Sequence, residues 1–141
     1  MLVAEIIRTK GEAVYSIGPD LTLAQACEEL QRRRVGALVV CAGDRVVGIL
    51  SERDVVRAVA EAGADALTAP VADHMTSKVV FAEPGETVAV LMERMTDRRI
   101  RHLPVMREQR LAGVISIGDV VKCHIEETTR EAESLRTYIA G

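Results

Sequence analysis

The chain contains a tandem duplication, and this feature restricts its possible folds more than any other. When segment 14–57 is placed on segment 79–122, a shift of 65 residues, the two align without a gap and 15 of the 44 pairs are identical. Chance at ordinary residue frequencies would give roughly three identical pairs. A copy of 44 residues is too small to bury a stable core by itself. We therefore expect the two copies to pack sheet to sheet as one pseudo-twofold unit.

Both copies open with a predicted helix. Thr22 and Thr87 are good N-cap residues, and Gln25 adds the partner that completes a capping box in the first copy. Apolar residues recur at helical spacing from Leu23 and from Val88. One face of each helix is therefore predicted to enter the core.

Two β-rich runs joined by a short turn follow each helix. They cover 35–41 and 45–51 in the first copy and 100–106 and 110–116 in the second. Pro104 lies inside one of these runs, which predicts an edge position or a strand end. A second helix comes after the runs. The predicted plan is helix, strand, strand, helix, with an extended lead-in that can add a strand.

Composition narrows the class of protein. With 48% hydrophobic and 28% charged residues, the chain is typical of a soluble globular protein without a membrane span. A net charge of −3 and only 2% aromatic residues disfavour nucleic acid as a partner. The N-terminal stretch has no signal-peptide pattern, so we expect a cytoplasmic protein. Cys27, Cys41 and Cys123 are widely spaced, which predicts three small core residues and neither a disulfide framework nor a metal site.

The second β-rich run of each copy ends in the same pattern, glycine-x-x-serine-x-x-aspartate. Ser-x-x-Asp at a helix start is a variant capping box, and helix stabilisation by about 1 kcal/mol is a sufficient explanation. A carboxylate there can also accept hydrogen bonds from both hydroxyls of a ribose, beside a helix N-terminus that favours an anion. The motif alone leaves both interpretations open. Its residues are Gly48, Ser51 and Asp54 in the first copy and Gly113, Ser116 and Asp119 in the second.

Positive charge that can hold a phosphate is concentrated in the second copy. Arg98, Arg99, Arg101 and His102 fall within five consecutive positions. We interpret Arg98 and Arg99 as solvating the end of a helix, where they offset its dipole. Arg101 is the better phosphate ligand, because a guanidinium is forked and permanently charged. For Arg53 a phosphate contact and a solvated side chain are equally good explanations.

The duplication, the repeated motif and the lead-in D-H-M-T-S-K-V-V at 73–80 together resemble a tandem pair of CBS domains, also called a Bateman module. The resemblance covers about residues 14–122. It implies a stand-alone pair of the α+β class, in which two β-α-β-β-α units pack with pseudo-twofold symmetry and form two related clefts. Family clefts commonly hold AMP, ADP, ATP, S-adenosylmethionine or a dinucleotide such as NAD. Stand-alone pairs commonly form homodimers, and such modules sense ligands without turning them over.

The resemblance implies a regulatory sensor that binds an adenine nucleotide in clefts between the repeats, with no cofactor and no metal. The aspartates would hold the ribose, the arginine and histidine the phosphates, and the two lead-in segments the adenine, with Tyr15 placed to stack on the ring. The residues expected to bind the ligand are Val14, Tyr15, Ser51, Arg53, Asp54, Met75, Thr76, Val79, Val80, Arg101, His102, Pro104, Ser116 and Asp119.

Two other classes of function are alternatives to the sensor. A ligand-free structural or interaction module, with an effector protein as its partner, agrees with the capping interpretation of the motif. An enzyme is disfavoured, because no metal-binding triad or phosphate-binding loop pattern is present. Cys123 and His124 are adjacent. On a helix they would point about 100° apart, so they do not make a nucleophile–base pair.

The duplication also divides the chain into segments. The tail is charged and mostly polar, so we expect an exposed helix there, which can dock on a partner protein or on a second copy. The predicted segments are a helical lead-in at 1–13, a first repeat at 14–62, a linker with the approach to the second repeat at 63–78, a second repeat at 79–124 and a helical tail at 125–141.

Overall fold

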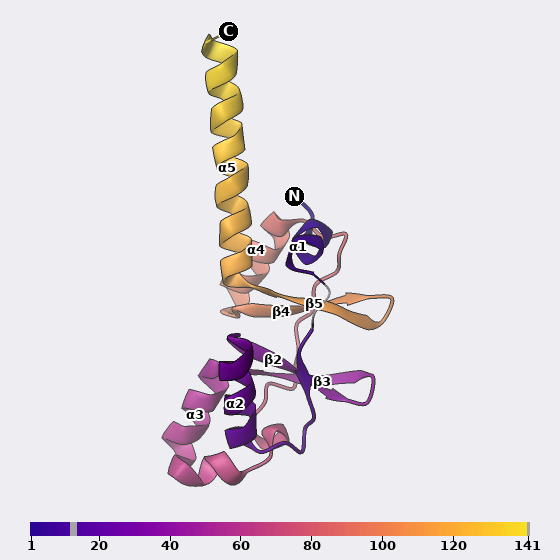
Figure 1. The fold of residues 1–141 in the computed structure, drawn as a ribbon, viewed down its shortest axis with the longest axis vertical. Helices are drawn as coiled ribbons and strands as arrows, with labels where there is room; N and C mark the ends of the chain where they lie inside the picture. The colour runs from indigo at the N-terminus through magenta and orange to yellow at the C-terminus, as the bar shows by residue number, and fades with distance from the viewer. Residues whose placement is uncertain (12–13, 141) are drawn as a thin grey trace. The chain divides into compact units, whose positions relative to one another are not determined.

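A computed structural model describes residues 1–11 and 14–140 of the chain (Figure 1). The chain divides into two compact units, one of residues 13–80 and one of residues 1–12 with 81–141. Each unit contains helix, strand, strand and helix, so the α+β class and the duplicated plan are confirmed. The elements are α1 (Val3–Lys10), β1 (Ser16–Ile17), α2 (Leu23–Arg33), β2 (Ala37–Ala42), β3 (Arg45–Ser51), α3 (Glu52–Ala62), the 3₁₀ helices η1 (Gly63–Thr68) and η2 (Val71–Asp73), α4 (Val88–Arg98), β4 (His102–Arg107), β5 (Arg110–Ser116) and α5 (Ile117–Ala140).

The unit of residues 13–80 is built on a three-stranded sheet of order β1-β2-β3. β1 runs parallel to β2, with Ile17 beside Val40, and β2 pairs antiparallel with β3. The lead-in before the first helix therefore adds a strand. The core of this unit consists of Ile17, Leu23, Ala26, Leu30, Leu38, Val40, Leu50, Ala58, Ala66 and Val71.

Side-chain caps fix the starts of α2 and α4. The hydroxyl of Thr22 accepts a hydrogen bond from the N–H of Gln25 at 3.2 Å, and the Gln25 side chain accepts one from the N–H of Thr22 at 3.0 Å. The predicted capping box is thus confirmed. Thr87 caps α4 through the N–H of Val90 at 3.3 Å. The two copies therefore begin their helices by the same local device.

The other unit contains a two-stranded antiparallel sheet of β4 and β5. Ala82 forms a parallel bridge to Val105, which matches the pair of Ile17 and Val40 at the shift of 65 residues. The second lead-in thus contributes a bridge in place of a strand. The buried apolar residues of this unit are Val3, Ile6, Ile7, Ala82, Val88, Leu91, Met95, Leu103, Val105, Ile115, Val120 and Cys123.

Pro104 lies in the middle of β4, opposite Val114 of β5. Its carbonyl accepts a hydrogen bond from the N–H of Ala82 at 2.9 Å. The strand-end alternative is therefore wrong and the edge alternative is correct. Both strands of a two-stranded sheet are edges, so the missing N–H of the proline interrupts no strand ladder.

The segments that precede the two copies occupy equivalent places in their units, although they lie outside the duplicated segments. Leu2 bridges Thr87 in one unit, and Pro70 bridges Thr22 in the other. Both segments contain the pattern Val-Ala-acidic, but they match at a shift of 68 residues and not 65. Each segment lies against the β-hairpin of its unit. We name residues 2–10 the N-terminal strap and residues 69–76 the linker strap.

The cysteine prediction is correct for one residue only. Cys123 is buried, whereas Cys27 and Cys41 are half-buried. Burial raises the pKa of all three thiols. Cys27 lies beside the buried Ala26 on α2, and Cys41 follows the four buried residues of β2. Each is therefore at the edge of a buried surface and not inside it.

Helix α5 is 24 residues long, and its buried residues are Val120 and Cys123. Every residue from 128 to 140 is exposed. Figure 1 shows this distal half of α5 running beyond the end of α4. The second helix of the second copy therefore continues without a break into the segment predicted as a helical tail.

Candidate functional site

The serine–aspartate motif of the first copy lies where β3 ends and α3 begins. Ser51 is the N-cap of α3, and its hydroxyl accepts a hydrogen bond from the N–H of Asp54 at 3.3 Å. Oδ2 of Asp54 accepts hydrogen bonds from the Ser51 N–H at 2.9 Å and from the Ser51 hydroxyl at 3.1 Å. The Thr76 hydroxyl and the Arg57 guanidinium donate to Oδ1 at 3.2 Å and 3.3 Å. Asp54 is only 5% exposed, and these four donors match the acceptor capacity of a carboxylate.

The second copy has the same cap but a different charged partner. The N–H of Ser116 donates to Oδ2 of Asp119 at 2.8 Å, and the Ser116 hydroxyl accepts from the N–H of Asp119 at 3.1 Å. Lys10 of the N-terminal strap donates to the same Oδ2 at 2.8 Å and to the carbonyl of Val114 at 2.8 Å. The hydrogen bonds from Lys10 and from the Ser116 N–H both end on Oδ2, and the Ser116 side chain also bonds to this carboxylate. The side chain of Asp119 is 24% exposed, so its carboxylate can accept further hydrogen bonds from a ligand.

Asp119 is ionised at neutral pH. Burial, the largest single influence, raises the pKa of its carboxyl, but the hydrogen bonds from Lys10 and Ser116 and the charge of Lys10 together outweigh it. The pKa of Asp119 consequently lies below its usual value. A charged carboxylate makes stronger hydrogen bonds to hydroxyl groups than a neutral acid would.

The glycine of each motif marks the place where a strap crosses the strand. A Cβ atom at Gly48 would lie 2.5 Å from Sδ of Met75 and 2.9 Å from the carbonyl oxygen of Thr76, both in the linker strap. A Cβ atom at Gly113 would lie 2.6 Å from Cδ1 of Ile7 in the N-terminal strap. Because each glycine has no side chain, the strap can pass close to the strand at this position. The same strap supplies a hydrogen-bond donor to the aspartate of that unit.

The lead-in to β1 reaches the same end of the sheet as the first motif. β1 is parallel to β2, and Ala37 at the start of β2 lies opposite Ser51. Val14 is half-buried and Tyr15 is 38% exposed. The guanidinium of Arg33 lies 4.4 Å above the centre of the Tyr15 ring. A cation therefore covers one face of the ring, and only the other face is available for stacking.

The residues predicted in and after the linker strap have different surroundings. Met75 is half-buried and packs against the core of its unit. Thr76 is exposed, and its hydroxyl is used by Asp54. Val79 and Val80 are half-buried and lie outside any helix or strand. Of these four, only Thr76 is bonded to the motif.

The predicted phosphate ligands gather at the end of the β4–β5 hairpin. Arg101 precedes β4, and its carbonyl accepts a hydrogen bond from the N–H of Ile117, the first residue of α5, at 2.8 Å. His102 is the register partner of Ser116. Arg101 is exposed and His102 is half-buried. The structure thus brings Arg101, His102, Ser116 and Asp119 to one strand end.

The remaining candidates lie away from this strand end or face other surroundings. Arg98 is in the last turn of α4, and Arg99 is its left-handed C-cap with φ of 54°. Arg53 is exposed in the first turn of α3. Pro104 is buried, and its position inside β4 makes it part of the sheet.

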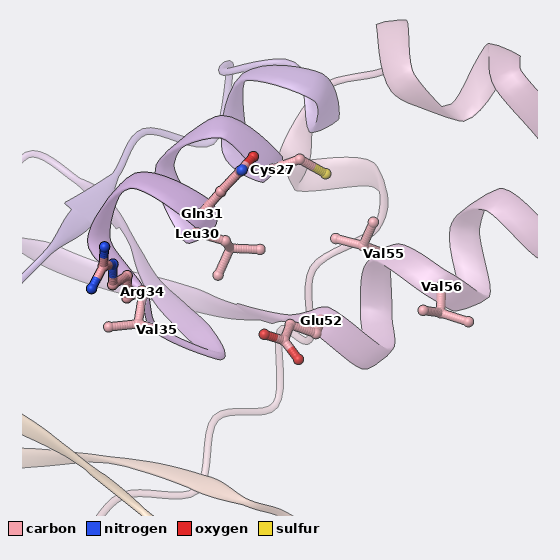
Figure 2. A pocket seen from close by; sticks show the side chains of 8 residues that line it. All are labelled: Cys27, Leu30, Gln31, Arg34, Val35, Glu52, Val55 and Val56. Carbon is pink, nitrogen blue, oxygen red and sulfur yellow. The ribbon is translucent and has the colours of Figure 1, made fainter.

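A separate hollow of about 450 Å³ opens between α2 and α3 (Figure 2). Leu30 and Cys27 of α2 and Val55 and Val56 of α3 contribute apolar side chains to its wall, and Glu52 lies at one end. None of the residues predicted to bind a ligand lines it. The hollow and the serine–aspartate motif are therefore different features of this unit.

Two residues that bond to the motif aspartates, Arg57 and Lys10, were not predicted from the sequence. Arg57 lies three residues after Asp54, and the spacing of charged pairs on a helix would have identified it. Lys10 is 109 residues from Asp119. Only the shifted match of the Val-Ala-acidic pattern would have placed its strap beside the second motif.

The described residues contain neither a cluster of metal ligands nor a helix that could span a membrane. Within residues 1–11 and 14–140, no group of three or more His, Cys, Asp or Glu side chains is arranged to hold a metal ion. In the same part of the chain, every helix is too short or too polar to cross a membrane. Cys123 is buried and His124 is exposed, so the two neighbours face different surroundings.

Comparison with known proteins identifies the family. The model of the family described as CBS domain matches residues 3–61 and residues 71–126. The chain belongs to the CBS domain family. Both matches begin at the Val-Ala-acidic pattern of a strap, so each CBS repeat includes a strap as well as the duplicated segment. The resemblance to a tandem CBS pair is confirmed.

Solved structures and curated relatives agree with this assignment. A CBS-domain containing protein from Agrobacterium tumefaciens is 44% identical with a TM-score of 0.86, over 88% of this chain and 99% of that one. A CBS domain protein from Pyrobaculum aerophilum, complexed with AMP, is 29% identical with a TM-score of 0.75, over 84% of this chain and 89% of that one. A mitochondrial CBS domain-containing protein of Arabidopsis thaliana is 33% identical, over 99% of this chain and 72% of its own length.

Proposed function

We propose that this CBS pair is a cytoplasmic regulatory sensor that binds an adenine nucleotide, with AMP as the first candidate. The observation that carries the proposal is the carboxylate of Asp119. It is ionised, lies beside the start of α5, and its side chain is 24% exposed, compared with 5% for Asp54. The hydroxyls of a ribose are suitable donors for such a carboxylate. The AMP complex of the Pyrobaculum aerophilum relative supports this choice of ligand class.

The surroundings of Asp119 favour a phosphorylated ligand. The exposed guanidinium of Arg101 belongs to the residue before β4, whose carbonyl is bonded to the first residue of α5. His102 pairs with Ser116 in the β4–β5 register. A ribose on Asp119 would therefore leave its phosphate within the region that Arg101 can reach, and guanidinium is the side chain best suited to that group.

The first copy favours the alternative function, a structural or interaction module. Four donors of its own unit occupy the carboxylate of Asp54, which is only 5% exposed. A ligand would have to displace Thr76 or Arg57 to reach it. We therefore propose that the second repeat contributes the main nucleotide site and that the first motif has mainly a capping role.

We also propose that the chain forms a homodimer. The hollow between α2 and α3 opens beside Val56, which is 68% exposed, and Val59 is 40% exposed. Apolar side chains that gather on a surface mark interaction sites. Sedimentation equilibrium measures the subunit number, and a monomer at micromolar concentration would contradict this part of the proposal.

The nucleotide proposal is tested by titrating the protein with AMP and with adenosine while its thermal unfolding is recorded. A ligand at ~100 times its dissociation constant adds about 2.7 kcal/mol to the free energy of unfolding. Asp119→Ala should weaken adenosine and AMP alike by ~1–3 kcal/mol, because a charged hydrogen bond is lost. Asp54→Asn is the matched control and should change the affinity less. No shift with any adenine nucleotide would favour the ligand-free module.

A further inference from the structure

Helix α5 presents an apolar stripe on its exposed length. Among the described residues of α5, only Val120 and Cys123, in its first turns, are buried. The exposed fraction is 58% for Ile125, 59% for Leu135 and 76% for Ile139. Figure 1 shows that the part of α5 carrying the last two residues extends beyond α4. Large apolar side chains that recur on one side of an exposed helix indicate a missing helical partner.

The stripe has the spacing of a coiled coil. Its residues alternate at intervals of four and three, as the a and d positions of a heptad do. Isoleucine occupies two of the three a positions and leucine one d position, a combination that favours two parallel strands. The hydroxyl of Thr128 donates to the carbonyl of His124 at 2.9 Å, so this d residue brings no unsatisfied polar group to the seam. The a residues are Ile125, Ala132 and Ile139, and the d residues are Val121, Thr128 and Leu135.

The charges that flank the stripe distinguish parallel from antiparallel pairing. Glu131 falls at a g position and Arg136 at the following e position. In a parallel pair, each g residue faces the e residue of the next heptad on the partner helix. Two copies of α5 therefore bring Glu131 of each against Arg136 of the other, with opposite charges. In an antiparallel pair e residues face e residues, which would set Arg136 against the e residue Lys122 of the second copy.

We propose that α5 pairs in parallel with α5 of a second copy of this chain along the stripe from Val121 to Ile139. The proposal rests on the homodimer proposed above and adds a second contact surface to the one beside the hollow between α2 and α3. A helix of 24 residues is about 36 Å long, so the stripe runs over most of three heptads. Contact between the folded units of the two copies, as proposed above, holds the two helices at a high local concentration, which compensates for the small Ala132 and Thr128 in the middle.

Disulfide trapping tests the pairing and its direction. In a chain with Cys27→Ala and Cys41→Ala, we would place one new cysteine at Leu135 and, as a matched control on the opposite face, one at Arg130. Leu135→Cys should form a covalent dimer under mild oxidation at least tenfold faster than Arg130→Cys, because a d residue meets its own copy in a parallel pair. Equal rates would overturn the proposal. Linkage seen only when Leu135→Cys is mixed with Ile125→Cys would show antiparallel pairing and would also overturn it.

A charge exchange provides a second test in the same Leu135→Cys chain. Glu131→Lys should slow the trapping by about fivefold, because both g–e pairs change from attraction to repulsion. Adding Arg136→Glu should restore the rate, whereas Glu133→Lys, a b position that faces away from the seam, should leave it unchanged. Sedimentation equilibrium of the full chain distinguishes failure of the α5 proposal from failure of the homodimer proposal. A dimer without trapping would refute α5 as the interface, and a monomer would refute the homodimer itself.

Discussion

Substituting Gly48 by alanine should destabilise the unit of residues 13–80 strongly. Gly48 lies where the linker strap crosses β3, and the Ile49 N–H and carbonyl bond to Thr76 at 3.0 Å and 2.9 Å. The added Cβ would meet the carbonyl oxygen of Thr76 at 2.9 Å and Sδ of Met75 at 2.5 Å. The thioether can turn away, but the carbonyl cannot move without breaking its bond to Ile49.

The magnitude follows from these two contacts. Overpacking of a tight site costs ~1–3 kcal/mol, and a weakened backbone hydrogen bond about 1 kcal/mol more. Gly48→Ala should therefore lower the free energy of unfolding by ~2–4 kcal/mol. At Gly113 the obstacle is Cδ1 of Ile7, at 2.6 Å, which is the end of a flexible side chain. Gly113→Ala should cost only about 0.5–1.5 kcal/mol, the strain of a displaced rotamer.

Urea unfolding followed by circular dichroism measures both variants, with a change in midpoint at constant slope reporting the difference in stability. A third variant, Gly48→Ala with Met75→Ala, removes the thioether and leaves the backbone contact. It should recover little of the loss. Equal destabilisation by Gly48→Ala and Gly113→Ala, or full rescue by Met75→Ala, would refute the assignment of Gly48 to a backbone crossing.

Three further predictions concern the motifs and their charges. Lys10→Met should lower the free energy of unfolding by about 0.5–1 kcal/mol at pH 7, since the ion pair with Asp119 is partly exposed. Because Lys10 holds the pKa of Asp119 below its usual value, this contribution is present above about pH 4 and is lost as the pH falls through the folded pKa. Urea titrations at several pH values should show the difference between wild type and Lys10→Met shrinking in acid, and a constant difference would contradict the role of the carboxylate. Arg101→Ala should weaken AMP in calorimetric titrations and leave adenosine nearly unchanged; equal losses would exclude a phosphate contact. Asp54→Ala should reduce stability by ~2–4 kcal/mol in urea unfolding, because it removes a cap and leaves the Thr76 hydroxyl without its acceptor; a loss below that of Asp119→Ala would contradict the proposed capping role of the first motif.

Much of the local structure could be predicted from short-range patterns. The capping box of Thr22 and Gln25 and the serine cap of α3 depend only on residues within one turn of each other. For Pro104 the sequence left two alternatives, an edge position or a strand end, and the register of β4 with β5 decided between them. Interactions that span few residues are encoded by spacing, whereas register is decided by packing.

The partners of the two aspartates could not be predicted from short-range patterns. Thr76 reaches Asp54 from 22 residues away, and Lys10 reaches Asp119 from 109 residues away. The two motifs share glycine, serine and aspartate at the same spacing, yet Asp54 is bonded by Thr76 and Arg57 and is 5% exposed, whereas Asp119 is bonded by Lys10 and is 24% exposed. Thr76 and Lys10 belong to the straps, which match each other at a different shift from the rest of the repeat, whereas Arg57 belongs to α3.

By itself the sequence determined the duplication, the CBS resemblance, the helix caps and the candidate carboxylates, because each of these is written in neighbouring residues or in the repetition of a pattern. Only the tertiary structure decided that each strap crosses a motif glycine and gives each aspartate its own donors. A crossing of this kind depends on which distant segments exclude water from the same surface, and hydrophobic burial is non-directional and carries no information about sequence separation.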